Sequence, residues 1–320
     1  MIQVERIKAI PLEKDKAVEY AKQAVTEKMK KTAINVKYLG GGSFGMAFGV
    51  EFENKEQIVV KFLRANDMLE KEVFDLKLLY DSSAIKFPKV LFVRKSDETI
   101  PVDCYAMDKI DGESAFASSL FDFFISKRKK QAFADKVTTA LHEVHTHTSE
   151  KFGDTLCPDC DNWLDYYKPF AGAVMDKAQE MSKSSELSRK IVDVMQEAWS
   201  KFDVIFSEEV NEACLIHGDL NLANIMVDKN FEISGFIDPL NSAYADREYD
   251  LFQFDNLLGK RFKLRKTYIQ KYGASKNCDI KCAFYGLWNE VYCYIKSGEL
   301  VSFIMNPLVK NMKKQLKYLD

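Results

Sequence analysis

The chain has 320 residues, of which 47% are hydrophobic and 29% are charged, and its formal net charge at pH 7 is −2. A length about twice that of a typical domain favours two lobes or domains in an ordinary globular protein. The near balance of charges disfavours a nucleic-acid partner, because phosphate backbones require a concentrated positive face. The compact basic run at residues 127–130 is typical of a solvated helix face.

No apolar run approaches the roughly 20 residues that a membrane helix requires, and residues 1–5 lack the charged-then-apolar order of a secretory signal. We therefore expect a cytoplasmic protein with no membrane partner, as a monomer or a homodimer. The seven cysteines are scattered and odd in number, which favours free thiols over a disulfide framework. Cys157 and Cys160 have CxxC spacing, but no second CxxC or paired histidines complete a tetrahedral zinc site.

Hydrophobic periodicity divides the chain into a leading helix, a β-rich region and a larger helical region. Apolar residues recur at helical spacing from Pro11 to about Lys30. Short β-branched and aromatic segments then predict antiparallel strands at residues 36–39, 47–52 and 57–62, a helix at 67–80, and two more strands at 90–93 and 104–107. Together these elements predict a small sheet that carries one main helix.

Beyond a connection at residues 108–112, helical spacing covers residues 114–151, 163–206 and most of the tail from 246. A loop rich in Gly, Pro and Cys separates the first two stretches. We therefore predict an α+β fold with a leading helical segment at residues 1–30, an N-terminal lobe at 31–110, and a larger, mostly helical C-terminal lobe at 111–320.

The glycine-rich segment Gly40 to Gly45 satisfies the pattern GxGxxG. It lies between two predicted strands and not between a strand and a helix, which removes the context that dinucleotide binding requires. A glycine-rich hairpin would instead let the backbone lie close over nucleotide phosphates, and a flexible turn is the structural alternative. The candidate phosphate-contacting residues are Gly40, Gly42, Ser43, Phe44 and Gly45.

Lys61 closes the predicted strand at 57–62, and a lysine on a buried strand requires a partner. Glu72 on the following helix is the preferred partner and Glu70 is its rival, while the ammonium would contact the α- and β-phosphates. A lysine that extends to water at the end of the strand is the structural alternative.

The segment His217 to Asn224, followed fourteen residues later by Asp238, carries the most specific chemistry of the sequence. Asp219 could accept the proton of an attacking hydroxyl, and Asn224 and Asp238 could hold Mg²⁺. Residues 214–216 and 225–227 are apolar, and we expect them to form a buried hairpin that presents the polar residues at one edge. A turn-forming Asp219 and a strand-capping Asp238 are the structural alternative.

Four histidines are not expected to act in catalysis or metal binding. His217 precedes the proposed base by two residues, and we expect it to have a structural role, with its ring hydrogen-bonded to nearby backbone. His142, His145 and His147 share one helix end, where their spacing gives poor ligand geometry.

Taken together, these motifs resemble the eukaryotic-protein-kinase-like superfamily, and within it the aminoglycoside phosphotransferase and choline kinase group. Residues 72–79 resemble the helix of that group's first lobe, residues 105–112 resemble its hinge, and residues 140–145 resemble the helix before its catalytic region. The resemblance runs from about Tyr38 to Leu251 and implies a two-lobed protein-kinase-like fold.

The resemblance also implies a role for each matching residue. Asp219 would be the catalytic base, Asn224 and Asp238 the magnesium ligands, and Lys61 with Glu72 the phosphate-positioning pair. The adenine would lie beside the segment Met107 to Ile110, with backbone groups of Asp108 and Ile110 as contacts. Asp250 matches the residue that braces the catalytic loop.

Two departures disfavour a protein kinase. Gly218 stands where protein kinases usually carry an arginine, and only eleven residues separate Asp238 from Asp250, with no Ala-Pro-Glu motif after them. Ala47 and the three successive glycines leave the choice between ATP and GTP open.

In the resembling group, the acceptor lies between the catalytic loop and the C-terminal helices, here at residues 244–300. The candidate acceptor-contacting residues are Tyr244, Glu248, Trp288 and Glu290. Acidic residues would suit a polyamine such as an aminoglycoside, and an aromatic cage would suit a quaternary ammonium group. Because Tyr285, Trp288 and Tyr292 share one helical stripe, core packing is the alternative for the aromatic residues.

The sequence thus predicts transfer of the γ-phosphoryl group of ATP or GTP, with Mg²⁺, to a hydroxyl of a small molecule. The acceptor would be an aminoglycoside-like antibiotic or a cationic metabolite. The alternatives are a nucleotide-binding regulatory pseudokinase and a protein or peptide kinase.

Overall fold

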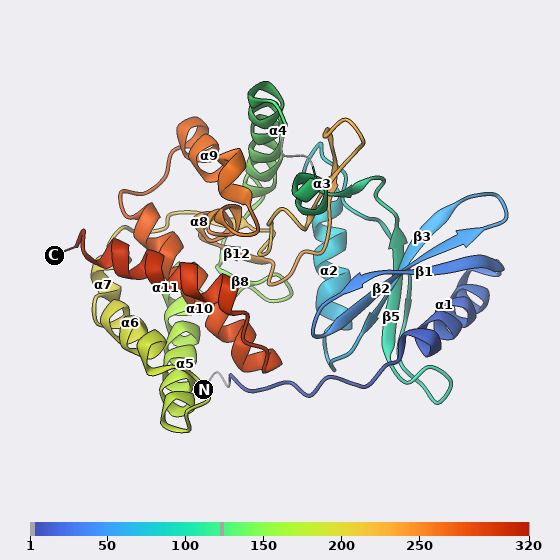
Figure 1. The fold of residues 1–320 in the computed structure, drawn as a ribbon, viewed down its shortest axis with the longest axis horizontal. Helices are drawn as coiled ribbons and strands as arrows, with labels where there is room; N and C mark the ends of the chain where they lie inside the picture. Colours follow the sequence, from blue (N-terminus) through green and yellow to red (C-terminus); the bar gives the residue numbers. More distant parts are fainter. Residues whose placement is uncertain (1–3, 122–124, 320) are drawn as a thin grey trace.

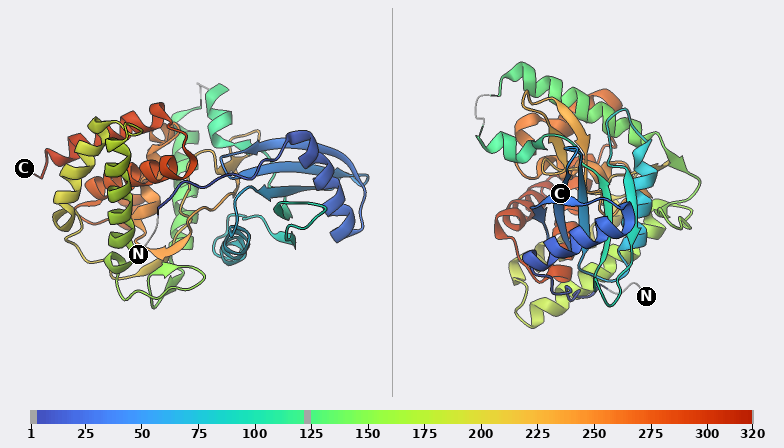
Figure 2. Two further views of the ribbon diagram at one scale, coloured as in Figure 1. Left: turned by 90° about the horizontal axis from the view of Figure 1, so that it is seen from below. Right: turned by 90° about the vertical axis from the view of Figure 1, so that its right-hand side faces the viewer.

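The computed structural model describes residues 4–121 and 125–319, and they form two lobes joined side by side (Figure 1). The N-terminal lobe holds a twisted antiparallel sheet, and the larger C-terminal lobe is mostly helical (Figures 1 and 2). This arrangement confirms the predicted fold class. No helix within the described ranges is long and apolar enough to cross a membrane.

Five antiparallel strands form the N-terminal sheet in the order β1-β2-β3-β5-β4. Their bounds are β1 (Ala33–Gly41), β2 (Gly45–Phe52), β3 (Gln57–Leu63), β4 (Val90–Arg94) and β5 (Asp103–Asp108). All five lie where the sequence predicts strands. The predicted turn at residues 53–56 joins β2 to β3, and the glycine-rich segment joins β1 to β2.

One helix packs on each face of this sheet. The predicted leading helix, α1 (Lys14–Met29), buries a stripe of small residues against Phe48, Val60 and Phe62, and this stripe comprises Ala17, Ala21, Ala24 and Val25. On the other face, α2 (Leu69–Tyr80) buries a stripe against Leu63 and Tyr105, comprising Leu69, Val73 and Leu76. Burial of these stripes removes apolar surface from water, at roughly 25 cal/mol per Å².

The C-terminal lobe is built around α10, whose side chains are buried along most of its length. Its helices are α3 (Ala115–Phe121), α4 (Lys127–His145), α5 (Trp163–Lys183), α6 (Arg189–Ser200), α7 (Phe202–Ile205), α8 (Glu248–Leu251), α9 (Leu264–Tyr272), α10 (Cys278–Ser297) and α11 (Ser302–Leu316), with the 3-10 turns η1 (Gln253–Asp255) and η2 (Gly259–Phe262). The predicted stretches 114–151 and 163–206 are each divided into separate helices. Ser126 and Ser188 occupy the N-cap positions of α4 and α6, where serine is favoured.

Two small sheets underlie the candidate site. One has the order β11-β10-β6 and the other β7-β9-β12-β8. Their strands are β6 (Glu113–Ser114), β7 (Thr148–Ser149), β8 (Gly153–Asp154), β9 (Ala213–Leu215), β10 (Ile225–Val227), β11 (Ile233–Phe236) and β12 (Ala243–Ala245). The predicted buried hairpin of residues 214–227 is therefore wrong, because β9 pairs with β7 and β12 whereas β10 pairs with β11 and β6. The polar loop at residues 217–224 is held by hydrogen bonds among its own residues, and β9 and β10 do not pair with each other.

The segment before α1 crosses from one lobe to the other (Figures 1 and 2). Val4 is buried in the core of the C-terminal lobe. The Ile7 amide donates a hydrogen bond to the Lys296 carbonyl (2.9 Å) at the end of α10, and the Ile10 amide donates one to the Arg64 carbonyl (2.7 Å) after β3. Residues 4–10 thus tie the lobes together.

Candidate active site

Lys61 on β3 joins the two lobes at the centre of the site. Its Nζ atom lies 2.8 Å from Glu72 Oε2 on α2 and 2.6 Å from Asp238 Oδ1 in the C-terminal lobe. The Tyr105 hydroxyl donates a second hydrogen bond to Glu72 Oε2 (3.0 Å). Burial of Lys61 opposes its charge, but the neighbouring carboxylates outweigh this effect and raise its pKa. The structure places Glu72 as the partner, whereas the rival Glu70 is exposed.

The glycine-rich hairpin lies directly above Lys61. A Cβ atom added at Gly45 would lie 3.0 Å from Lys61 Cε, and one added at Gly41 would lie 2.4 Å from the Gly45 carbonyl oxygen. Added Cβ atoms at Gly40 and Gly42 would meet nothing within 4 Å. The turn is held by the Gly42 amide, which donates to the Gly45 carbonyl (3.1 Å). Gly41 is therefore the hairpin position where the backbone leaves no room for a side chain, and it is not among the glycines predicted from the sequence.

The Asp219 carboxylate is held by three side-chain amides. Oδ1 accepts hydrogen bonds from Asn221 (3.0 Å) and Gln253 (2.8 Å), and Oδ2 accepts one from Asn224 (2.9 Å). Burial, reinforced by the charge of Asp238, raises the pKa of Asp219 to about 8 despite these donors. A carboxyl group with a pKa near neutrality suits general base catalysis.

Asn224 and Asp238 lie side by side because β10 pairs with β11. The Ile237 amide donates to the Asn224 carbonyl (2.9 Å), which sets the next residue, Asp238, beside Asn224. Asn224 donates its side-chain amide to both the backbone and the carboxylate of Asp219, so its side-chain oxygen remains as a ligand. Burial opposes ionisation of Asp238, but Lys61 outweighs it and holds the pKa of Asp238 below its usual value. A carboxylate and an amide oxygen are a donor set that fits Mg²⁺.

Asp250 supports the loop at residues 217–224 through hydrogen bonds to its backbone. Its two carboxylate oxygens accept hydrogen bonds from the backbone amides of His217 (2.8 Å) and Gly218 (2.7 Å). His145 on α4 adds a third contact, Nε2 to Asp250 Oδ2 at 3.1 Å. His217 is fully buried, burial lowers its pKa, and its Nδ1 accepts a hydrogen bond from the Asp219 amide (3.3 Å). These contacts fit the structural roles expected for His217 and Asp250.

The backbone conformation explains the glycine that distinguishes this loop from that of protein kinases. Gly218 has φ +82°, and an added Cβ atom would lie 2.2 Å from the Leu240 carbonyl oxygen. An arginine would therefore be strained at this position and would collide with the chain after Asp238.

The predicted adenine-binding segment lies at the end of β5, between the lobes. Met107 pairs with Val59 and Val90 in the sheet. The Asp108 amide is already bonded to the Lys89 carbonyl (2.9 Å), and the Ile110 side chain is buried. The adenine contacts of Met107, Asp108 and Ile110 stay predictions.

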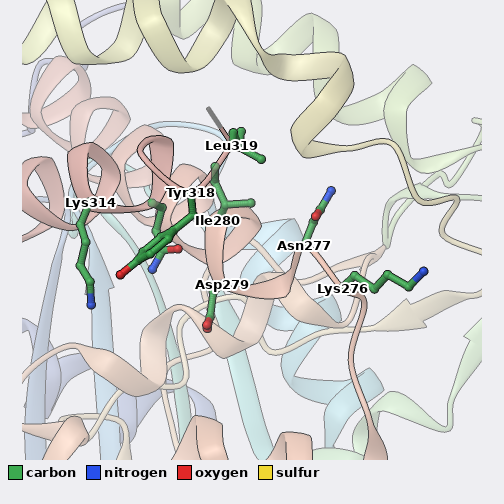
Figure 3. Close-up of a pocket in the computed structure, with 8 residues that line it drawn as sticks. Lys276, Asn277, Asp279, Ile280, Lys314, Tyr318 and Leu319 are labelled. Carbon is green, nitrogen blue, oxygen red and sulfur yellow. The ribbon is translucent and has the colours of Figure 1, made fainter.

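A cleft of about 370 Å³ opens beside Glu72 between α2, the chain after Asp238, α5 and α10. Its aromatic lining residues are Trp163, Tyr166, Tyr167, Phe170, Tyr249 and Tyr292. A second hollow, of about 420 Å³, lies between the start of α10 and the end of α11 and includes none of the predicted site residues (Figure 3). The first cleft is the one that adjoins the Lys61 pair.

Two of the four predicted acceptor contacts are corrected by the structure. Trp288 is fully buried, stacks on Phe284 with ring centroids 3.6 Å apart, and donates its indole hydrogen to the Ala171 carbonyl (2.9 Å). Glu248 is also buried and pairs with Lys281 (2.9 Å). Both residues hold the core of the C-terminal lobe together and present no surface to an acceptor.

The other two acceptor candidates remain partly accessible. Tyr244 lies in β12, next to the cleft-lining Ala243. Glu290 on α10 forms no hydrogen bond or ion pair with the described residues, and burial raises its pKa to about 7. Glu290 is therefore a carboxyl group without a partner among the described residues.

Several residues at the site were missed by the sequence analysis. Asn221 could have been found, since it lies inside the motif that contains Asp219. Gln253 contacts Asp219 only through the tertiary fold, and no local pattern marks it. His145 lies in the segment that resembles the helix before the catalytic region, but its contact with Asp250 follows only from the fold. The residues that the structure describes contain no group of three or more His, Cys, Asp or Glu side chains that could hold a metal ion.

A small antiparallel sheet that carries Lys61 and faces a mostly helical lobe carrying Asp219, Asn224 and Asp238 forms a two-lobed, protein-kinase-like fold. A model of the phosphotransferase enzyme family matches residues 51–277. The chain belongs to this family, and it is a phosphotransferase enzyme. The resemblance predicted from the sequence is thereby confirmed.

Solved structures share the fold at low sequence identity. The chain is similar to a thermostable mutant of aminoglycoside phosphotransferase APH(4)-Ia in complex with AMP-PNP and hygromycin B, with a TM-score of 0.68, 16% identity, and coverage of 92% of this chain and 97% of that one. It is also similar to the GDP complex of aminoglycoside 2'-phosphotransferase-IIIa (TM-score 0.68, 16% identity, 94% and 99% covered) and to macrolide 2'-phosphotransferase type I (0.63, 14%, 96% and 99%). A search of curated proteins found no match in sequence.

Proposed function

We propose that this enzyme transfers the γ-phosphoryl group of a magnesium-bound nucleoside triphosphate to a hydroxyl group of a small molecule. The observation that carries the proposal is the position of Lys61, whose ammonium contacts both Glu72 (2.8 Å) and Asp238 (2.6 Å) across the two lobes. This contact brings the lysine that would position the phosphates beside the carboxylate that would hold the metal. Such an arrangement is suited to phosphoryl transfer, which depends mainly on positioning and charge neutralisation.

Asp219 would act as the base toward the acceptor hydroxyl. Two amide donors occupy Oδ1, whereas Oδ2 receives one donor and keeps a lone pair free. The hydroxyl proton would pass to Oδ2 as the acceptor oxygen bonds to phosphorus and the nucleoside diphosphate leaves. Because burial raises the pKa of Asp219, its carboxylate is a stronger base in the ionised form than an exposed aspartate.

The nucleotide would lie between the glycine-rich hairpin and the catalytic loop. Asn224 and Asp238 would hold Mg²⁺, which neutralises the charge of the phosphate oxygens when it is bound. The nucleotides named for the similar structures, AMP-PNP and GDP, support a nucleotide donor. The donor would be ATP or GTP, with the base beside Met107 to Ile110.

We further propose a cationic acceptor, such as an aminoglycoside-like antibiotic or an amine-bearing metabolite. Of the carboxylates that line the cleft beside Glu72, Glu72 pairs with Lys61, and Asp75 and Asp154 pair with Lys71. Glu290 has no partner within the described part of the chain, and a half-buried, unpaired carboxyl group would gain from an acceptor cation. The aromatic lining of the cleft would provide cation–π contacts for an acceptor cation.

An acceptor screen with magnesium and either ATP or GTP tests this function. The panel would span aminoglycosides, macrolides, choline, fructosamines and sugars, with release of nucleoside diphosphate as the signal. We expect one class to stimulate release and the Asp219→Asn variant to lose that stimulation. Nucleotide binding without transfer to any acceptor would identify a regulatory pseudokinase instead. Transfer to casein-like substrates alone would identify a protein kinase.

A further inference from the structure

We propose that Gln253 is a positioning residue for the catalytic base, a role that rests on the proposed function and deepens it. Gln253 lies in η1, outside every motif that the sequence analysis identified. Its side chain is 3% exposed, and its Nε2 atom donates a hydrogen bond to Asp219 Oδ1 at 2.8 Å. Gln253 would act through Asp219 and would not touch the reacting atoms.

The orientation of the Gln253 amide is fixed by its second contact. Asn256 Nδ2 donates a hydrogen bond to Gln253 Oε1 (2.8 Å). Because that oxygen is occupied by a donor, the Nε2 end of the amide must face the carboxylate. Asn256 is itself held at the end of η1, where its backbone amide donates to the Gln253 carbonyl (3.1 Å). The pair forms a small hydrogen-bond chain that ends on the base.

This chain of hydrogen bonds determines which carboxylate oxygen of Asp219 is open to the acceptor hydroxyl. Asn221 and Gln253 together occupy both acceptor directions of Asp219 Oδ1, whereas Asn224 occupies one direction of Oδ2. The remaining lone pair of Oδ2 is the position open to an acceptor hydroxyl. The terminal torsion of an aspartate is soft, so without Gln253 the carboxylate could rotate and turn this lone pair away. A misplacement of about 1 Å can cost about a hundredfold in rate.

The first test compares steady-state kinetics of the wild type with the Gln253→Leu variant. We expect kcat to fall roughly 10- to 100-fold while the KM values for nucleotide and acceptor stay within about twofold, because binding contacts are kept and base alignment is lost. The matched control is Gln315→Leu, which makes the same replacement in the remote hollow of Figure 3 and should leave kcat unchanged. A kcat within about twofold of the wild type, or a parallel rise in acceptor KM, would overturn the proposal.

A second variant, Asn256→Ala, keeps Gln253 and removes only the donor that orients it. We expect a smaller fall in kcat than for Gln253→Leu, again with KM unchanged. If Gln253→Leu does not fold, the kcat of Asn256→Ala decides whether Gln253 positions Asp219. Unchanged kcat in Asn256→Ala with a misfolded Gln253→Leu protein would assign Gln253 to folding and overturn its positioning role. If wild-type transfer is abolished by Asp219→Asn but unaffected by both variants, only the role of Gln253 fails. If the wild type transfers phosphate to no acceptor, the proposed function fails and the role of Gln253 fails with it.

Discussion

At the scale of single residues, the pair between Lys61 and Glu72 is the contact most closely tied to nucleotide chemistry. The Glu72→Gln substitution should lower kcat about tenfold or more, because the ammonium loses a charged partner that fixes its position. Steady-state kinetics with saturating acceptor would measure the effect. Glu70→Gln is the matched control, two residues away on the exposed side of the same helix. Equal effects of the two substitutions would contradict the assignment of Glu72.

Glu290 gives the acceptor site a specific pH dependence. Burial raises its pKa to about 7, so the carboxyl group gains a proton as the pH falls through that value. A cationic acceptor requires the ionised form, and its KM should therefore rise as the pH is lowered from about 8 to about 6. Glu290→Gln should raise this KM and remove its pH dependence, whereas the exposed Glu299→Gln should change neither. A KM that is flat with pH in the wild type would argue against an acceptor cation at Glu290.

The residues of the site differ in how far the sequence could identify them. Asp219, Asn224, Asp238, Lys61 and Glu72 belong to motifs whose spacing reflects their chemistry, and the structure brings all five together. Trp288 and Glu248 were misassigned because the sequence pattern of an aromatic or acidic residue on a helix is the same in a core and in a binding site. Only the contacts with Ala171 and Lys281 show that both are used inside the fold.

At the scale of elements, the glycine-rich hairpin has one position where packing forbids a side chain. Gly41→Ala would place a Cβ atom 2.4 Å from the Gly45 carbonyl, whereas Gly40→Ala would meet nothing within 4 Å. We expect the first substitution to distort the hairpin and to raise the KM for the nucleotide about tenfold, equivalent to about 1.4 kcal/mol. The second should leave the KM unchanged. A similar KM in the two variants would show that the hairpin does not contact the phosphates.

The short helix α8 supports the catalytic loop through Asp250. Asp250→Ala would leave the His217 and Gly218 amides buried without acceptors. We expect the free energy of unfolding to fall by about 3 kcal/mol, as measured by urea denaturation. Asp203→Ala removes a carboxylate whose side chain is 83% exposed and should change the stability by less than about 0.5 kcal/mol. Comparable losses in the two variants would contradict a bracing role for Asp250.

Most elements could be predicted because their hydrophobic periods are regular. The pairing of the strands at residues 214–227 could not be predicted, because three apolar residues on either side of a loop do not specify which strands they will join. β9 pairs with β7 and β12, whereas β10 pairs with the neighbouring β11 and with β6, more than 100 residues earlier in the sequence. Nonlocal strand pairing of this kind leaves little signal in the residues themselves.

At the scale of the whole molecule, the site exists only where the two lobes meet. Lys61 belongs to the N-terminal sheet and Asp238 to the C-terminal lobe, and residues 4–10 connect the same lobes at a second place. The relative position of the lobes therefore sets the distance between Lys61 and the proposed base, Asp219. Composition and periodicity predicted two lobes, but the crossing of residues 4–10 follows only from the three-dimensional structure.

The proposed reaction is phosphoryl transfer from a nucleotide to a small-molecule hydroxyl with Asp219 as the base. Phosphorus NMR of the enzyme with magnesium, nucleoside triphosphate and the best acceptor tests it most directly. We predict a new phosphate-monoester resonance on the acceptor that grows as the γ-phosphate signal declines, and that is absent with the Asp219→Asn variant. Appearance of inorganic phosphate alone, or an ester that forms equally fast with Asp219→Asn, would rule out this reaction with Asp219 as its base.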